Sequence, residues 1–269
     1  MVGSFPLGTP EPFFEKGEIA NVLLIHGYTG TPYDFRYLSD IFLEKGLGCY
    51  VPLLTGHGTQ ALEINTSTAA QWLNDAEQAF HKMPADKPRI IAGLSMGGLI
   101  ATILAAKHAQ EISGLMLLAP AFQLTFGNRV GIMLARLGLY HFIPAIKKSD
   151  GPCDVADPVA KRNSPAYLSI PLKGLIQLNS LQKQAIRCAT KINCPVFAAF
   201  GKLDHTVDSL ASIEILKKFG YDHLQIKEYM RSQHVLPIDI DKAELADDLA
   251  QFCQDLCIQS KAGDERGRS

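Results

Sequence analysis

The sequence has no excess of charge of one sign: its 269 residues include 26 Lys+Arg and 27 Asp+Glu. It therefore has no basic surface to hold a polyphosphate backbone, and we expect no nucleic-acid partner. It also has no run of about 18 uninterrupted apolar residues, the length that a membrane-spanning helix needs. The first 20 residues lack a secretory apolar core, which favours a cytoplasmic protein with no integral membrane segment.

Motifs for metals and cofactors are missing as well. The six cysteines never occur in CxxC spacing, and we expect free thiols that serve mainly in packing. The HExxH motif is absent, and no cluster has the ligand spacing of a zinc site. Neither a dinucleotide fingerprint nor a Walker loop follows a predicted strand. We therefore expect no cofactor and no metal.

What is present is a regular alternation of short apolar runs and helical patterns. The predicted strands are 21–25, 49–53, 89–94, 114–118, 195–200 and 224–230. The predicted helices are 33–45, 69–82, 96–110, 207–218 and 242–258. Because a parallel crossover needs a dozen residues or more, this alternation predicts an α/β fold with a mostly parallel sheet and helices on both faces.

The alternation breaks between Pro120 and Cys194, a stretch of 75 residues. This stretch is rich in large apolar side chains, so we expect an inserted, mostly helical cap packed on the core. The predicted division is a core of 1–120 and 189–259, a cap of 121–188 and a polar tail of 260–269. The apolar stretch 130–143 could instead form a dimer contact or a lipid-facing surface, so the choice between monomer and homodimer stays open.

The segment Gly93-Leu94-Ser95-Met96-Gly97 fits the pattern G-x-S-x-G. It ends a predicted strand and opens a predicted helix, where a sharp elbow would expose the Ser95 hydroxyl as a nucleophile. A side chain at either glycine would crowd this turn. The alternative is a glycine-rich turn with a helix-capping serine.

A serine hydroxyl needs a base to accept its proton, and the base needs a third group to orient it. The elbow architecture places an acid and then a histidine late in the chain. His234 lies just beyond the strand 224–230, and Asp204 lies just past the strand 195–200, so both reach the same edge of the sheet. We predict His234 as the base and Asp204 as the acid, with Asp208 and Asp239 as weaker rivals.

Backbone N–H groups are the expected partners of the oxyanion that forms during acyl transfer. One is the amide of Met96, the residue after the nucleophile, and for the second we choose Tyr28 in the loop after the first predicted strand. Gly27 is expected to border the substrate. An ordinary strand-to-helix loop is compatible with the same residues. His26 and His57 are expected to bond backbone groups rather than a metal.

Five motifs, HGYTGTP, PLLTGHG, AGLSMGG, GKLDHTVD and SQHVLPID, occur in this order. Together they resemble the α/β-hydrolase superfamily, and within it the sequence is most similar to bacterial carboxylesterases and monoacylglycerol lipases. The resemblance covers about residues 20–258 and implies roles for Ser95, Asp204, His234 and the amides of Tyr28 and Met96. Because few residues precede the first predicted strand, we expect a reduced sheet of about six or seven strands with an inserted helical cap.

These observations predict a serine carboxylesterase that acts through an acyl-enzyme on Ser95. The apolar cap suggests short- to medium-chain esters or monoacylglycerols, with Leu137 and Phe142 as candidate contacts to the substrate. The same triad would also serve a thioesterase or an acyltransferase, and a non-catalytic acyl-binding module is a further alternative. A small-molecule ester or acyl compound is therefore the expected partner.

Overall fold

The computed structural model describes residues 9–266 of the chain. Its main feature is a seven-stranded sheet with the order β1-β3-β2-β4-β5-β8-β9. The strands are β1 (Phe13–Glu15), β2 (Ala20–Ile25), β3 (Leu47–Val51), β4 (Arg89–Leu94), β5 (Gly114–Leu118), β8 (Val196–Gly201) and β9 (Leu224–Tyr229). Neighbouring strands pair in parallel except β1, which runs antiparallel to β3. The predicted mostly parallel sheet of six or seven strands is confirmed.

The sequence pattern does not predict β1. This strand has three residues, of which Phe13 is buried while Phe14 and Glu15 are exposed, and so few alternating positions do not form a recognisable strand pattern. It pairs with the sheet along β3 only, with Phe13 opposite Val51. It therefore forms one edge of the sheet and contributes none of the candidate site residues.

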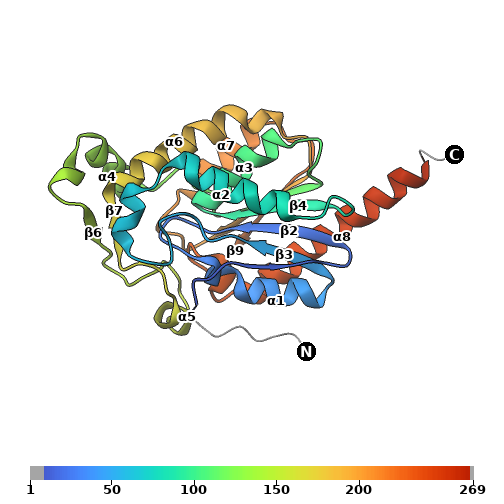
Figure 1. Cartoon of the computed structure of the whole chain (residues 1–269), viewed down its shortest axis with the longest axis horizontal. Helices are drawn as coiled ribbons and strands as arrows, with labels where there is room; N and C mark the ends of the chain where they lie inside the picture. The colour runs from blue at the N-terminus through green and yellow to red at the C-terminus, as the bar shows by residue number, and fades with distance from the viewer. Residues whose placement is uncertain (1–8, 267–269) are drawn as a thin grey trace.

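Helices cover both faces of the sheet (Figure 1). One face carries α1 (Arg36–Glu44) and α8 (Lys242–Arg266), and the other carries α2 (Ala69–Lys82), α3 (Met96–Lys107), α6 (Leu172–Cys188) and α7 (Ser209–Lys218). Successive residues of a strand point to opposite faces. Leu23 of β2 packs in the cluster under α2 and α3, whereas Leu24 packs in the cluster under α1 and α8. Burial on both faces explains why the strands read as continuous apolar runs.

Between β5 and α6 the chain forms a separate lobe, seen at the left of Figure 1. It contains α4 (Phe126–Arg136), β6 (Ala145–Lys147), α5 (Pro158–Asn163) and β7 (Ser169–Pro171). β6 and β7 pair as a two-stranded antiparallel sheet, which the sequence analysis did not anticipate because each strand has three residues. α4 contacts α6, and α6 packs on α3, so the lobe is anchored to the core. The boundaries at residues 121 and 188 stay predictions.

The loops contain short 3-10 helices: Pro32–Phe35, Ala61–Thr66, Leu139–His141, Ala189–Lys191 and Leu236–Ile238.

At the C-terminus, the predicted end of the last helix at Ile258 is wrong, because α8 continues to Arg266. An apolar pattern marks only the part of a helix that packs, and the end of α8 projects beyond the sheet (Figure 1). Residues 267–269 lie outside the described part of the chain. Within the described part, no helix is both long and apolar enough to cross a membrane.

The strand order creates a crevice at the carboxyl ends of β2 and β4. The chain passes from β2 to β3 on one side of β2 and returns to β4 on its other side. Ligands of open α/β sheets bind at such a point, where the crossovers leave in opposite directions. Ile25 at the end of β2 pairs with Gly93 near the end of β4. The loops that follow these two strands therefore begin side by side.

Candidate active site

Ser95 occupies a strained turn between β4 and α3. Its backbone has φ 56° and ψ −113°, a left-handed conformation that a residue other than glycine adopts only at a cost of about 1–3 kcal/mol. The turn is held by backbone hydrogen bonds from Ser95 N to Leu118 O at 2.9 Å, from Gly98 N to Ser95 O at 3.0 Å and from Ala121 N to Ser95 O at 3.2 Å. The side chain lines a cavity at the carboxyl end of the sheet. This geometry is the elbow that G-x-S-x-G predicts.

Close backbone approach explains both glycines of the motif. A Cβ on Gly93 would lie 2.1 Å from the carbonyl oxygen of Gly97, and a Cβ on Gly97 would lie 1.9 Å from that of Ile25. Both distances are far shorter than any van der Waals contact. Because these positions carry no side chain, the start of α3 packs directly against the end of β2. The two glycines thus set the position of Ser95 relative to the loop after β2.

His234 and Asp204 form a buried hydrogen-bonded pair. His234 Nδ1 lies 2.8 Å from Asp204 Oδ2, and their side chains are 8% and 0% exposed. The other carboxylate oxygen, Oδ1, accepts hydrogen bonds from Thr206 N at 2.7 Å and Val207 N at 2.8 Å. Asp204 is therefore fixed by the turn that leads into α7. Because Nδ1 faces the carboxylate, the other ring nitrogen, Nε2, is the one left to act as a base.

The protonation of His234 is governed by opposing effects. Burial by itself lowers the pKa of His234, but the negative charge of Asp204 and its hydrogen bond outweigh burial. Asp154 adds a smaller effect in the same direction as Asp204, and Lys148 a small opposing one. The resulting pKa lies above the ordinary 6.5. A carboxylate in this position stabilises the imidazolium that forms when the histidine accepts a proton.

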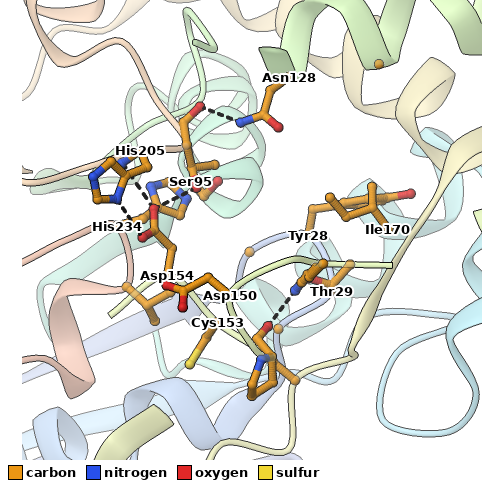
Figure 2. Close-up of a pocket in the computed structure, with 18 of the residues that line it drawn as sticks. Tyr28, Thr29, Ser95, Asn128, Asp150, Cys153, Asp154, Ile170, His205 and His234 are labelled. Atoms are coloured by element: carbon orange, nitrogen blue, oxygen red, sulfur yellow. Dashed lines mark hydrogen bonds and ion pairs between the residues drawn. The ribbon is translucent and has the colours of Figure 1, made fainter. Parts of the chain in front are cut away.

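Asp154, which the sequence analysis did not single out, connects the inserted lobe to both loops of this pair. Its carbonyl oxygen accepts hydrogen bonds from His234 N at 3.1 Å and Val235 N at 3.0 Å. Its carboxylate accepts from His205 N at 3.1 Å and Thr206 Oγ1 at 2.9 Å. Figure 2 shows the side chains of Asp154 and His205 facing each other, with His205 Nδ1 3.3 Å from Asp154 Oδ1. An aspartate in an irregular segment has no periodic pattern that would reveal such a role.

Asp239 and Asp208, the two alternatives to Asp204 as the acid, each have a structural role. Asp239 is fully buried and accepts hydrogen bonds from Gln233 N at 2.7 Å and from Ala156 N at 2.9 Å. It therefore ties the loop before His234 to the inserted lobe. Asp208 caps the N-terminus of α7 through a hydrogen bond from Ala211 N at 3.0 Å.

The loop after β2 lies directly against the serine. A Cβ on Gly27 would be 3.3 Å from Cβ of Ser95, and Gly27 and Tyr28 line the same cavity as Ser95. Among the described residues, no hydrogen-bond acceptor is recorded for the amide of Tyr28 or for that of Met96. Two unused N–H groups beside a serine are what an oxyanion hole requires. Their role as oxyanion donors stays a prediction.

The inserted lobe also forms hydrogen bonds with the loop after β2. Lys148 Nζ donates to Thr29 Oγ1 at 2.8 Å and to the Pro152 carbonyl at 2.5 Å. Tyr167 N donates to Thr29 O at 3.2 Å, and Tyr28 Oη donates to the Pro171 carbonyl at 2.5 Å. Burial lowers the pKa of Lys148 to about 8, so its ammonium group is still protonated at neutral pH. Lys148 lies outside every recognisable motif, and the sequence analysis missed it.

The cavity has a volume of about 560 Å³ and is drawn in Figure 2. Its polar part includes Lys148, Asp154 and the buried Asp34, whose pKa burial raises to about 7. Its apolar side chains come mainly from the inserted lobe and α6: Leu124, Ile146, Ile170, Leu172, Leu175 and Leu178. The predicted contacts Leu137 and Phe142 are not among the lining residues and are 76% and 85% exposed. The structure therefore does not bring these two residues to Ser95.

His26 and His57 bond backbone groups, as predicted. His26 Nε2 accepts from Leu54 N at 3.1 Å, so its Nδ1 donates to the Gly27 carbonyl at 3.0 Å. His57 Nδ1 lies 3.2 Å from the Thr55 carbonyl. Burial lowers the pKa of His26 well below its ordinary value and that of His57 to about 4. Both rings are therefore neutral at physiological pH and support the loops behind the cavity.

The parallel sheet, the serine elbow and the buried acid–histidine pair define an α/β-hydrolase. A solved structure of the metagenome-derived lipolytic enzymes LipS and LipT has the same fold, with a TM-score of 0.81 at 23% identity, covering 93% of this chain and 100% of that chain. The family model described as "Serine aminopeptidase, S33" matches residues 17–241. Because this match spans most of the sequence, the chain belongs to that family.

Two relatives are similar along nearly their whole length. The chain is 27% identical over 247 residues to a thermostable monoacylglycerol lipase of Bacillus sp. (strain H-257), covering 91% of this chain and 95% of the lipase. It is 24% identical over 252 residues to a carboxylesterase of Bacillus subtilis (strain 168), covering 92% and 98%. The resemblance to carboxylesterases and monoacylglycerol lipases that the motifs indicate is therefore confirmed.

Proposed function

We propose that the chain is a carboxylic ester hydrolase that forms an acyl-enzyme on Ser95. One observation carries this proposal: the hydrogen-bonded pair of Asp204 and His234 belongs to the same site as Ser95, and Ser95 and His234 line one cavity. A serine in a strained elbow, a buried histidine and an orienting carboxylate are the groups that acyl transfer requires. The names of the two Bacillus relatives favour esters as substrates.

The reaction then follows from the positions of these groups. Ser95 Oγ attacks the ester carbonyl while His234 Nε2 accepts the hydroxyl proton, and Asp204 stabilises the imidazolium. The amides of Tyr28 and Met96 donate hydrogen bonds to the oxyanion, each contributing about 3 kcal/mol to lowering the barrier. The imidazolium gives its proton to the departing alcohol. Water then attacks the acyl-enzyme while His234 takes its proton, and His234 passes that proton to Ser95 Oγ as the carboxylic acid leaves.

The cavity favours an ester with one apolar part and one small polar part. Its apolar lining from the lobe and α6 suits an acyl chain, and its volume of about 560 Å³ suits a short- to medium-chain ester or a monoacylglycerol. The side chains of Lys148, Asp154 and Asp34, which also line the cavity, offer hydrogen-bond partners for an alcohol that carries hydroxyl groups. Leucines of α6 therefore determine the accepted chain length in this proposal.

Hydrolysis of p-nitrophenyl esters from acetate to palmitate tests the proposal. We expect activity to peak at one chain length and to disappear in Ser95→Ala. Leu175→Trp fills the apolar part of the cavity and shifts the peak to shorter esters. Leu137→Trp is the matched control, because Leu137 is exposed and lies outside this cavity. A chain-length profile that Leu175→Trp leaves unchanged contradicts the assigned acyl site.

A second comparison distinguishes ester hydrolysis from thioester hydrolysis and from a non-catalytic role. Oxygen esters and thioesters with the same acyl group should differ in kcat/KM in favour of the oxygen ester. A clear preference for the thioester would instead make the chain a thioesterase with the same triad. If neither compound is hydrolysed and a serine-directed phosphonate fails to label Ser95, the chain is a non-catalytic module.

A further inference from the structure

A cluster of metal-ligating side chains lies at the far end of α3 from Ser95. Glu77 and His81 are one helical turn apart on α2, and His108 directly follows α3. One ligand atom from each residue lies within 4.8 Å of the other two. Ser95 precedes α3 and His108 follows it, and a helix of 12 residues is about 18 Å long. The cluster is therefore separate from the candidate active site.

The distances within the cluster suit a tetrahedral ion. Glu77 Oε1 lies 3.1 Å from His108 Nε2 and 3.9 Å from His81 Nε2. When zinc binds nitrogen and oxygen ligands at about 2.0–2.1 Å, two ligand atoms of a tetrahedron are about 3.3 Å apart. The His81 side chain is 58% exposed, so its ring has room to rotate toward this arrangement. A water molecule would be the fourth ligand.

Both ring nitrogens of His108 lie close to a carboxylate oxygen. Its Nδ1 lies 2.9 Å from Glu111 Oε1, and its Nε2 faces Glu77. A neutral imidazole has one N–H group, so one of its nitrogens would direct a lone pair at a carboxylate. A metal ion bound at Nε2 removes this repulsion. Glu111 is held in place by Arg89 at 2.7 Å, and with a metal at Nε2 the Nδ1–H group donates to Glu111.

A carboxylate that fixes the far nitrogen of a ligating histidine is a recurrent feature of zinc sites. Here Glu111 has that position behind His108. Lys107 Nζ, 2.5 Å from Glu77 Oε1, is the existing cation beside the cluster. Lys107 donates a hydrogen bond to Glu77 Oε1, the oxygen that would bind the metal ion. The Lys107 side chain is 58% exposed and is free to rotate into solvent when an ion arrives.

We propose that Glu77, His81 and His108 bind one divalent transition-metal ion such as Zn²⁺, which cross-links α2 to the end of α3. The ion takes no part in ester hydrolysis. Its role is structural, because it joins two helices that pack on the same face of the sheet. This site departs from the sequence-based expectation of no metal. His108 is 27 residues beyond His81, and no spacing rule reveals ligands that the fold brings together from two helices.

Isothermal titration of the full chain with Zn²⁺ at slightly alkaline pH tests the proposal. We expect one ion per chain and a rise in Tm of about 5 °C at a hundredfold excess of free Zn²⁺ over Kd. Glu77→Gln and His108→Gln abolish this binding, and Glu111→Gln, which removes no ligand, weakens it about tenfold. His223→Gln is the matched control for adventitious binding to an exposed histidine and should bind Zn²⁺ like the parent chain.

Circular dichroism of each variant without metal shows whether it is folded, so that a loss of binding is not mistaken for unfolding. The proposal is overturned if the parent chain binds no Zn²⁺, or if His108→Gln and His223→Gln bind it equally well.

Discussion

Lys148 Nζ donates a hydrogen bond of 2.8 Å to Oγ1 of Thr29, which joins the inserted lobe to the loop after β2. Thr29 has φ +65°, a left-handed conformation that a β-branched residue adopts only when its surroundings support it. It directly follows Tyr28, the predicted oxyanion donor. The lobe therefore supports the strained loop that carries the predicted oxyanion donor.

Lys148→Met should lower kcat for a p-nitrophenyl ester by about tenfold, the value of one hydrogen bond to a charged group. We expect little change in KM, because the lost interaction positions the oxyanion loop rather than the ester. Thr29→Val removes the same hydrogen bond with an isosteric side chain. In a double-mutant cycle, adding Lys148→Met to Thr29→Val should have little further effect.

Lys217→Met is the control for this cycle, because Lys217 pairs with Glu214 on α7, their side chains are 58% and 63% exposed, and neither residue lines the cavity. Fully additive effects of Lys148→Met and Thr29→Val would show that the two side chains act independently. That result would rule out the proposed support of the loop.

The pH dependence of kcat/KM should report the proton on His234. The base must be neutral, so activity falls as the pH drops through its pKa. Because Asp204 raises this pKa above 6.5 against the effect of burial, the midpoint of the acid limb should lie above 6.5. Asp204→Asn removes the charge and should move the midpoint to lower pH while decreasing kcat by about 10⁴-fold. A midpoint that stays in place in Asp204→Asn would mean that another group titrates.

Stability at acid pH should depend on His57. Burial lowers the pKa of its folded state to about 4, compared with about 6.5 in an unfolded chain. Between these values only the unfolded state binds the proton, so the free energy of unfolding falls as the pH drops from 6.5 to 4. The contribution of His57 to this fall is about 3 kcal/mol.

His57→Phe keeps a ring at this position and removes the titrating group. Urea unfolding at several pH values should therefore show a smaller loss of stability between pH 6.5 and 4 in His57→Phe than in the parent chain, by about 3 kcal/mol. Equal losses in the two proteins would show that His57 is not held neutral by burial. His223→Gln, an exposed histidine, serves as the comparison.

The sequence is sufficient to predict the residues that end or follow regular strands. The bounds of β4, β5 and α2 were predicted without error, since these elements are long or fully buried and have clear start and stop signals. Ser95, Asp204 and His234 follow β4, β8 and β9, and the carboxyl ends of parallel strands necessarily meet at one edge. The hydrogen bond between Asp204 and His234 is consistent with that reasoning.

The sequence does not predict which residues of the inserted lobe reach the site. Lys148 and Asp154 lie in irregular chain between β6 and α5, where neither periodicity nor a turn signal indicates the direction of a side chain. Apolar composition drew attention to Leu137 and Phe142, yet both are largely exposed. Composition shows that a segment has apolar side chains, but only packing shows which of them reach the cavity.

The role of Ser95 as a nucleophile is tested most directly by mass spectrometry of the intact chain during turnover of a p-nitrophenyl ester. We expect a single added acyl group that maps to the peptide containing Ser95 and that decays as the carboxylic acid is released. Ser95→Ala should carry no acyl group and should hydrolyse the ester at a small fraction of the parent rate. Hydrolysis by Ser95→Ala at the parent rate, or an acyl group on another residue, would contradict the proposed mechanism.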